Sequence, residues 1–461
     1  MKTKHIIFTS IFPAIALISS CKNMPLEPKS KSQNANQTLA IPEKFDSTIP
    51  PVPEVANGLL SLFSDAELSR YVKQALKSNP NLQTSLARLE EAGFNTRKSY
   101  APGVPALSAG AGLGRRRANG SNAGLYSATL DAQWEVDVWG RIRAGINAAS
   151  QSQAALAADH EAARQSIAAQ TMQAYFSLIA SEKLLDLSQR RLAIFEKTAN
   201  LVNRRFEAGT GKLSDLDLAR TDVENTRGQV EQRKNARDQA ARQLAALTGS
   251  YPNTRASAKN YPALKRSVPA GIPSSVLLNR PDIHAAYARI LAADSRVTVA
   301  HRDLYPRFPL TASAGQQSNI LKKLADTNFS VWSIAGNLTA PILDGGSRRA
   351  ELGAANARAK QALSNYRSTV LSAFQEVENA LGSEYYLKRQ QLSYKNALKA
   401  AKNAESSTQR NYENGLVEIL TLLDAQRRSF STEESLINTE ALRFQNRVSL
   451  ALALGNGGKG L

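Results

Sequence analysis

Residues that commonly bind metals or act as nucleophiles are scarce in this chain. The sequence has one cysteine and four histidines, none with a second ligand at the paired spacing of a zinc site. It also has no phosphate-binding loop, nucleophile elbow or coupled acid pair. We therefore predict no enzyme activity, no metal site and no cofactor other than a lipid on the cysteine. His5 lies in the expected signal peptide, and the other histidines are expected at packing or surface positions: His160, His284 and His301.

The single cysteine, Cys21, follows a secretion-type N-terminus. Residues 6–18 form an apolar run behind two lysines, too short to cross a bilayer as a helix and typical of a signal peptide. The run ends in Ile-Ser-Ser-Cys, which resembles the lipobox of bacterial lipoproteins. We expect residues 1–20 to be removed and Cys21 to carry a covalent lipid. Because Lys22, not aspartate, follows the cysteine, lipoprotein sorting favours the outer membrane.

The segment 126–137 alternates between apolar residues at even positions and polar residues at odd positions. A period of two indicates a β-strand with one apolar and one polar side. Strands of about 10 such residues cross outer membranes with the apolar side in lipid and the polar side facing a lumen. We expect a lumen lining that modestly favours cations, formed by Asp131, Glu135 and Asp137. The alternative is a soluble two-sheet domain with one hydrated face.

Four strands are expected in all, at about 104–115, 125–137, 309–318 and 329–343. Membrane barrels need about eight strands or more, and an open sheet edge in lipid leaves backbone groups unpaired. The chain must therefore oligomerise. Two, three or four copies would supply about 8, 12 or 16 strands, and strand number alone leaves these choices open.

Basic residues are abundant, since 58 lysines and arginines against 39 acidic residues give a formal charge of +19. No zinc-finger spacing or RNA-binding motif accompanies them, so nucleic acid is not an expected partner. Most are expected on solvated helix faces. Five lie at the predicted hairpin tips, where they would meet lipopolysaccharide phosphates outside the cell: Arg115, Arg116, Arg117, Lys322 and Lys323.

An internal repeat relates the two halves of the chain at a shift of 206 residues, as Gly140 and Gly346 illustrate. Such a period is far longer than the roughly 20–50 residues of solenoid repeats, so a domain-sized unit is duplicated. Each unit is expected to contain a first helix, two strands and a long helix pair. The expected organisation is a tether (21–58), repeat one (59–249), an equatorial linker (250–275), repeat two (276–455) and a tail (456–461).

The helix pairs are unusually long. Residues 146–208 contain no glycine or proline and could span roughly 95 Å at about 1.5 Å per residue. A break follows at 209–211, and repeat two has the same pattern. Dense alanines and mixed three- and four-residue apolar spacings predict a helical wall in which each helix has two neighbours, rather than an ordinary coiled coil. A capping box, Ser64 with Glu67, is expected to open the first helix.

Several motifs together resemble one known family, the TolC-like outer membrane efflux proteins, and within it the lipid-anchored OprM-type channels. The likeness covers nearly the whole mature chain. Tyr287 departs from the family pattern, in which glutamate is frequent, so local equatorial packing is expected to differ. The motifs are VPAGIP (268–273), NRPDI (279–283), YPRFPL (305–310), ILDGG (342–346), Tyr412 with Gly415, and LTLLDAQ (420–426).

The resemblance implies a fold class that is mainly α with a pair of transmembrane β-hairpins. Four strands per chain would complete a 12-stranded trimeric β-barrel, and the helices would form a long periplasmic barrel. The implied partners of the homotrimer are outer-membrane lipid, a periplasmic adaptor (membrane fusion) protein and an inner-membrane pump. Substrates would pass through without any reaction.

The resemblance also implies that the tunnel closes at the two periplasmic helix turns, where the adaptor docks. The closure is either acidic, through Glu418, or largely hydrophobic. The alternative is that these are ordinary turn residues that only dock the adaptor. The residues concerned are Gly209, Thr210 and Lys212 in the first turn and Gly415, Leu416, Val417 and Glu418 in the second.

The expected function is therefore an outer-membrane exit duct that exports drugs or other small toxic compounds. The expected location is the outer membrane, with a lipid anchor and an extension through the periplasm. Alternatives are a duct for protein secretion or metal export, and a periplasmic coiled-coil lipoprotein that forms no channel.

Overall fold

The structure is a computed structural model that describes residues 30–32, 63, 65–118, 120–262 and 274–455. The signal peptide, Cys21, most of the tether, the VPAGIP motif and the tail lie outside the described residues. Among the residues described, no helix is both long and apolar enough to cross a bilayer.

Two compact units make up the chain, and each draws on both sequence repeats. The strand unit contains Lys98–Ala148 and Ile290–Leu363 together with residues 30–32, and the hairpin unit contains the other residues that the structure describes. The units therefore do not coincide with the predicted repeats. Contacts form between equivalent parts of the two repeats, rather than within each repeat alone.

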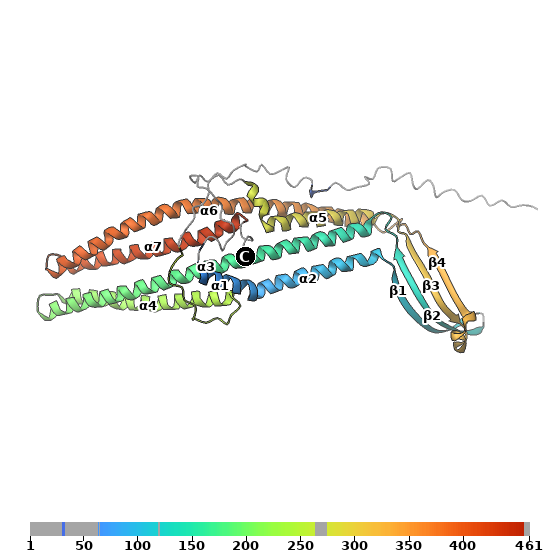
Figure 1. The fold of residues 1–461 in the computed structure, drawn as a ribbon, viewed down its shortest axis with the longest axis horizontal. Coiled ribbons are helices and arrows are strands. Elements are labelled where there is room, and N and C mark those ends of the chain that lie inside the picture. The colour runs from blue at the N-terminus through green and yellow to red at the C-terminus, as the bar shows by residue number, and fades with distance from the viewer. Residues whose placement is uncertain (1–29, 33–62, 64, 119, 263–273, 456–461) are drawn as a thin grey trace, which may run out of the picture. The chain divides into compact units, whose positions relative to one another are not determined.

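The strand unit holds one antiparallel sheet with the order β1-β2-β3-β4. Its strands are β1 (Ala106–Ala118), β2 (Ser121–Glu135), β3 (Pro309–Ser318) and β4 (Ser330–Gly336). Figure 1 shows the four strands side by side in a curved sheet. Gly120, with φ of 80°, lies in the tight β1–β2 turn, a conformation that glycine adopts without strain.

Three strand ends differ most from the prediction. β2 begins at Ser121 instead of near 125. β1 continues to Ala118 instead of ending near 115, so the three arginines belong to the strand and not to a loop. β4 ends at Gly336 instead of 343, which leaves Leu338 and Ile342 outside it. The reason is its partner, because β3 begins at Pro309, which has no N–H to continue the ladder. Beyond it only an isolated bridge forms, between Arg307 and Thr339.

The long helices of the two repeats match in length. α3 (Arg141–Glu207) and α6 (Ser347–Glu413) have 67 residues each, and α4 (Leu213–Leu247) and α7 (Ile419–Ala453) have 35 each. Figure 1 shows α3 with α4, and α6 with α7, as two helical hairpins. Gly382 lies inside α6 without interrupting it.

The remaining helices are shorter than those of the two hairpins. The helix predicted to open repeat one is in fact two, α1 (Ala66–Ser78) and α2 (Pro80–Tyr100). Asp65 caps α1 by accepting hydrogen bonds from the N–H groups of Glu67 and Leu68, instead of the predicted Ser64 box. Ser64 itself lies outside the described residues. The others are α5 (Pro281–Arg302) and the 3₁₀ helices η4 (Ala101–Gly103), η5 (Ser274–Asn279), η6 (Leu321–Ala325) and η7 (Thr327–Phe329).

Each unit has its own core. In the hairpin unit, buried residues of α1, α3, α4 and α7 form the largest cluster, with Phe176 and Phe444 in ring contact at 5.1 Å between centroids. In the strand unit, α5 and α6 pack through small residues such as Ala300 and Ala359, which allow close helix approach.

Candidate functional site

The strand register separates the sheet into two faces. Directly paired residues share a face, so Leu113 lies with Tyr126, and Ala314 lies with both Leu130 and Trp332. One face, here called the apolar face, is continuous over all four strands. It is formed by Leu107, Ala109, Ala111, Leu113, Tyr126, Ala128, Leu130, Ala132, Trp134, Leu310, Ala312, Ala314, Trp332 and Ile334.

The opposite, polar face carries two of the three expected lumen carboxylates, Asp131 and Glu135. Asp131 accepts hydrogen bonds from Ser313 Oγ at 2.7 Å and from Thr129 Oγ1 at 2.9 Å, both from the same face. Its oxygens are thus tied to neighbouring hydroxyls, and no described cation pairs with it. Asp131 therefore places a carboxyl group on the polar side of the sheet.

The other two carboxylates have structural partners. Glu135 accepts two hydrogen bonds from Arg141 Nη2, at 2.9 and 3.0 Å. Asp137 lies beyond β2 and caps α3 by accepting from the backbone N–H groups of Ile142 and Arg143, both at 2.9 Å. The expected lumen lining of Asp131, Glu135 and Asp137 stays a prediction, and Asp131 is the one of the three without a described cationic partner.

The same capping device recurs in repeat two. Asp344 accepts from the N–H groups of Gly346 and Arg348 at the start of α6. The hydrogen bond from the Arg348 backbone lowers the pKa of the Asp344 carboxyl. Each long helix thus begins on an aspartate that follows the sheet, which explains why α3 starts before the predicted residue 146.

Aromatic residues gather at the base of the strands. The indole N–H of Trp134 donates to the Gly103 carbonyl at 3.1 Å, and that of Trp139 donates to the Pro306 carbonyl at 2.8 Å. Trp139 also stacks near Tyr305, with 5.2 Å between ring centroids. An apolar ring with a satisfied polar group suits a membrane–water interface.

The basic residues at the far end of the sheet divide by register. Arg115 pairs with Gly124 and Arg117 with Asn122, so both continue the apolar face beyond Leu113, whereas Arg116 lies on the polar face. All three side chains are exposed. Lys322 and Lys323 lie on η6, and the Lys323 ammonium lies 5.4 Å from the Phe329 ring centroid.

The two helix turns share one backbone design. The N–H of Thr210 donates to the Arg205 carbonyl at 2.9 Å, and the N–H of Leu416 donates to the Asn411 carbonyl at 2.8 Å. Gly209 and Gly415 precede them with φ of 73° and 77°. This is a glycine-dependent helix C-cap, repeated in both hairpins.

The expected closure residues differ in environment. Leu416 is 72% exposed, and Glu418 is exposed at the N-cap of α7, where a negative charge is favourable. Val417 instead packs against a buried cluster that includes Val202 and Leu422. Lys212 holds the equivalent N-cap of α4. The turn thus presents Leu416 and Glu418, while Val417 supports it from inside.

No pattern in the sequence indicated the contacts that join the two hairpins. Arg205 Nη2 donates to the carbonyls of Tyr412 at 2.6 Å and Glu413 at 3.1 Å, and its guanidinium lies 4.3 Å from the Tyr412 ring centroid. These carbonyls end α6, and that of Tyr412 also accepts from the N–H of Gly415 at 3.0 Å. Farther along, Arg427 Nη2 donates to both oxygens of Asp222, at 2.8 and 2.7 Å.

A third connection centres on Glu433 of α7. Its carboxylate pairs with Arg190 of α3 at 2.7 Å and with Lys402 of α6 at 2.9 Å. Burial alone would raise the pKa of Glu433, but the hydrogen bonds from Lys402 and Arg190 outweigh it and lower the pKa. Glu433 therefore links the first hairpin to both helices of the second.

The tether also has a contact that the sequence analysis missed. The Asp294 carboxylate of α5 accepts from Ser30 Oγ at 2.5 Å and from the N–H groups of Lys31 and Ser32 at 2.9 Å. The sequence of residues 30–32 shows only residue types that are frequent in turns. Nothing in it indicated that the segment contacts Asp294.

The described histidines divide between packing and surface positions, with His284 exposed. His160 Nδ1 lies 2.7 Å from Ser85 Oγ, and His301 is buried, with its pKa lowered by burial and then by Arg302. Among the described residues no cluster of three potential metal ligands occurs. Tyr287, the departure from the family pattern, packs its ring 6.1 Å from that of Tyr366.

Comparisons with known proteins agree with this architecture. The outer membrane protein OprJ of Pseudomonas aeruginosa is 33% identical over 409 residues, which are 86% of this chain and 85% of that protein. The cation efflux system protein CusC of Escherichia coli K12 is 27% identical over 405 residues, 87% and 89% of the two chains. The structure of the outer-membrane channel OprN superposes with a TM-score of 0.87 at 26% identity, covering 94% of this chain and 99% of that one.

A family model described as outer membrane efflux protein matches residues 71–250 and 272–456, one segment in each repeat. The mainly helical fold with four strands per chain, consistent with a trimeric barrel, is the one found in these relatives. The resemblance to TolC-like proteins is thereby confirmed. The chain belongs to the outer membrane efflux protein family and is an outer-membrane efflux channel component that extends into the periplasm.

Proposed function

We propose that this chain forms the exit duct of a three-part efflux pump, through which drugs and other small toxic compounds leave the cell. The observation that carries the proposal is the continuous apolar face of the sheet, opposite a polar face that retains Asp131. A sheet of this kind separates lipid from an aqueous path. Solutes pass without reaction, so the chain acts as a conduit and not as an enzyme.

The duct is a homotrimer in this proposal. β1 and β4 each have one neighbour within the chain, so each leaves a row of backbone groups unpaired. Such edges are not tolerated in lipid. Pairing of β4 with β1 of the next copy satisfies both edges, and three copies give a barrel of about 12 strands.

The two helix turns are proposed to receive the periplasmic adaptor protein, which links the duct to an inner-membrane pump. A lipid on Cys21 is proposed to add a second attachment to the membrane. The contact of residues 30–32 with Asp294 supports a tether that returns to the folded chain soon after that cysteine.

Organic compounds fit this chain better than copper-type cations. Soft cations favour thioether and thiolate ligands. Met172, the one methionine among the described residues, is fully buried in the core, so its sulfur is not available to a passing ion. The relative CusC is by name a cation efflux protein, so metal export is the second candidate.

Cells that lack this chain, compared with cells that carry it, distinguish these functions. We expect the deletion to lower tolerance of antibiotics and solvents and to leave tolerance of copper and silver salts unchanged. Loss of metal tolerance alone would favour metal export, and loss of a secreted protein would favour secretion. The purified protein should conduct ions in planar bilayers and co-purify with an adaptor, and a non-channel lipoprotein would do neither.

The second turn is proposed to close the duct. Comparing the conductance of variants in the second turn with that of a variant in the first turn tests this proposal. Leu416→Gly combined with Glu418→Ala removes the two exposed side chains, and we expect a severalfold rise in conductance in planar bilayers. Thr210→Ala at the equivalent position of the first turn is the control and should leave conductance unchanged. An unchanged conductance in the double variant would show that these residues only dock the adaptor.

A further inference from the structure

An open cavity of about 930 Å³ in the hairpin unit is lined without a single charged residue. Fourteen residues from the α1–α2 junction, α3, α4 and α7 surround it, and nine carry an amide or hydroxyl side chain. Charged residues form 21% of the chain, so a lining of this size would ordinarily include about three. This lining therefore stands apart from the rest of the surface.

The amides occupy one face of each helix. Gln170, Gln173 and Ser177 recur at helical spacing on α3, as do Gln445 and Ser449 on α7. The opposite faces of the same helices supply the main apolar core, which α1 and the chain near Ala258 cover. The covered side of this helical layer cannot line a path for solutes, so the open, amide-bearing side is the one that can.

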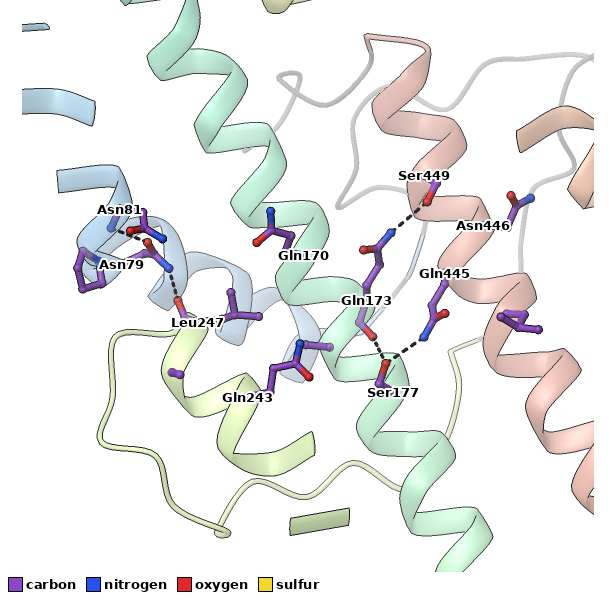
Figure 2. A pocket seen from close by; sticks show the side chains of 14 residues that line it. Asn79, Asn81, Gln170, Gln173, Ser177, Gln243, Leu247, Gln445, Asn446 and Ser449 are labelled. Carbon is purple, nitrogen blue, oxygen red and sulfur yellow. Dashed lines mark hydrogen bonds between the residues drawn. The ribbon is translucent and has the colours of Figure 1, made fainter. Parts of the chain in front are cut away.

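Hydrogen bonds between helices hold the amides in place. Gln173 Nε2 donates to Ser449 Oγ at 3.0 Å, and Gln445 Nε2 donates to Ser177 Oγ at 2.9 Å, as Figure 2 shows. Each amide nitrogen thus bonds across to the other helix, whereas the side-chain carbonyl oxygens of both glutamines have no hydrogen-bond partner among the described residues. Gln243 on α4 adds an amide whose donors and acceptor are likewise unused there.

We propose that these amides line the conducting path at this level and make it electrically neutral. They bind hydroxyl and amide groups of passing solutes and do not select by charge. This rests on the proposed function as a duct and adds where, along the helices, charge discrimination is absent. Selectivity between cations and anions then arises elsewhere, for instance at Asp131.

Introducing charge at Gln173 tests the proposal. Full-length Gln173→Glu and Gln173→Lys variants are placed in planar bilayers under a potassium chloride gradient, and the reversal potential gives the cation-to-anion permeability ratio. A charge within several ångströms of a passing ion in water should shift this ratio about threefold, upward for Glu and downward for Lys. Gln445→Glu, across the cavity, repeats the test if the first variants do not assemble.

Gln189 is the matched control. It is exposed on the same helix, sixteen residues from Gln173, which is about 160° around the helix axis. Gln189→Glu and Gln189→Lys should leave the ratio unchanged. If the variants at Gln173 and Gln445 conduct but have the same cation-to-anion permeability ratio as the unmodified protein, the inference is wrong. The proposed duct function would not be affected by that result. An unmodified protein that never conducts would instead refute the duct function, and this inference with it.

Discussion

Individual side chains in the strand unit are assigned their roles by which side of the backbone they occupy. The three consecutive arginines of β1 have the same charge and similar exposure, yet the register places Arg115 and Arg117 beyond the apolar face and Arg116 beyond the polar face. Arginine forms bidentate hydrogen bonds with phosphate. The two that continue the apolar face are therefore the ones expected to meet lipid phosphates.

Neutralising these arginines separately tests that assignment. Because each basic residue near an anionic surface contributes about 1 kcal/mol, Arg115→Gln with Arg117→Gln should weaken lipopolysaccharide binding by about 2 kcal/mol, roughly 30-fold. Arg116→Gln should have little effect. The measurement is the amount of lipopolysaccharide retained by the purified protein in detergent. Equal losses from the double variant and from Arg116→Gln would contradict the assignment by register.

At the scale of helices, the two hairpins are joined by buried apolar clusters, such as the one that contains Phe176 and Phe444, and by a few polar contacts. The hairpins α3–α4 and α6–α7 each close through a glycine turn, but neither turn fixes one hairpin against the other. The polar contacts between the hairpins include those of Arg205 at the carbonyl end of α6, the Asp222–Arg427 pair and the contacts of Glu433. Any movement of one hairpin past the other must break these contacts.

The Glu433 contacts make hairpin association dependent on pH. The folded-state pKa of Glu433 lies below its ordinary value of 4.5, so its contribution is fully present above that pH and is lost as the pH falls through the lowered pKa. Glu433→Gln should lower the free energy of unfolding of the hairpin unit by about 2 kcal/mol at pH 7. The deficit relative to the unmodified protein should shrink below pH 4.5.

Thermal unfolding followed by circular dichroism across this pH range measures the difference. Asp186→Asn is the control, because Asp186 also pairs with Arg190 but its side chain is 68% exposed. Exposed pairs within one helix contribute about 0.3–0.5 kcal/mol. A Glu433→Gln deficit that persists unchanged at acid pH would show that the charge of Glu433 is not its source.

At the scale of the whole molecule, the single chain is an incomplete membrane protein. It supplies four strands with two unpaired edges, together with a face of leucine, alanine and aromatic side chains that is exposed in the isolated chain. Trp332 and Ile334 are 78% and 77% exposed, which lipid would tolerate and water would not. Contact with lipid would cover the apolar face of the sheet, and pairing with further copies of the chain would satisfy its two unpaired edges.

A charge placed on either face of β4 distinguishes lipid from lumen. Ile334→Arg puts a cation on the apolar face and should cost about 2–4 kcal/mol near the bilayer midplane, which lowers the yield of assembled oligomer. Ser333→Arg, one residue away on the polar face, should assemble normally. Cross-linking of membranes followed by mass determination measures the yield and should give three chains per oligomer. Equal yields from both variants would refute the assignment of the faces.

The sequence by itself determined the repeating, local features. The period of two in β2 determined which side is apolar, and the 206-residue repeat with its glycine-free runs predicted the two long hairpins, because both depend on spacing along one segment. The family resemblance added the trimer and the partners, which the residues alone left open.

Only the tertiary structure decided which groups are already occupied by partners far away in the chain. Asp137 caps α3, Glu135 pairs with Arg141, and Asp294 holds residues 30–32. The end of β4 likewise follows from a proline in its neighbour. Periodicity records the direction of a side chain relative to its own backbone, whereas its partner depends on how distant segments pack, and no local spacing contains that information.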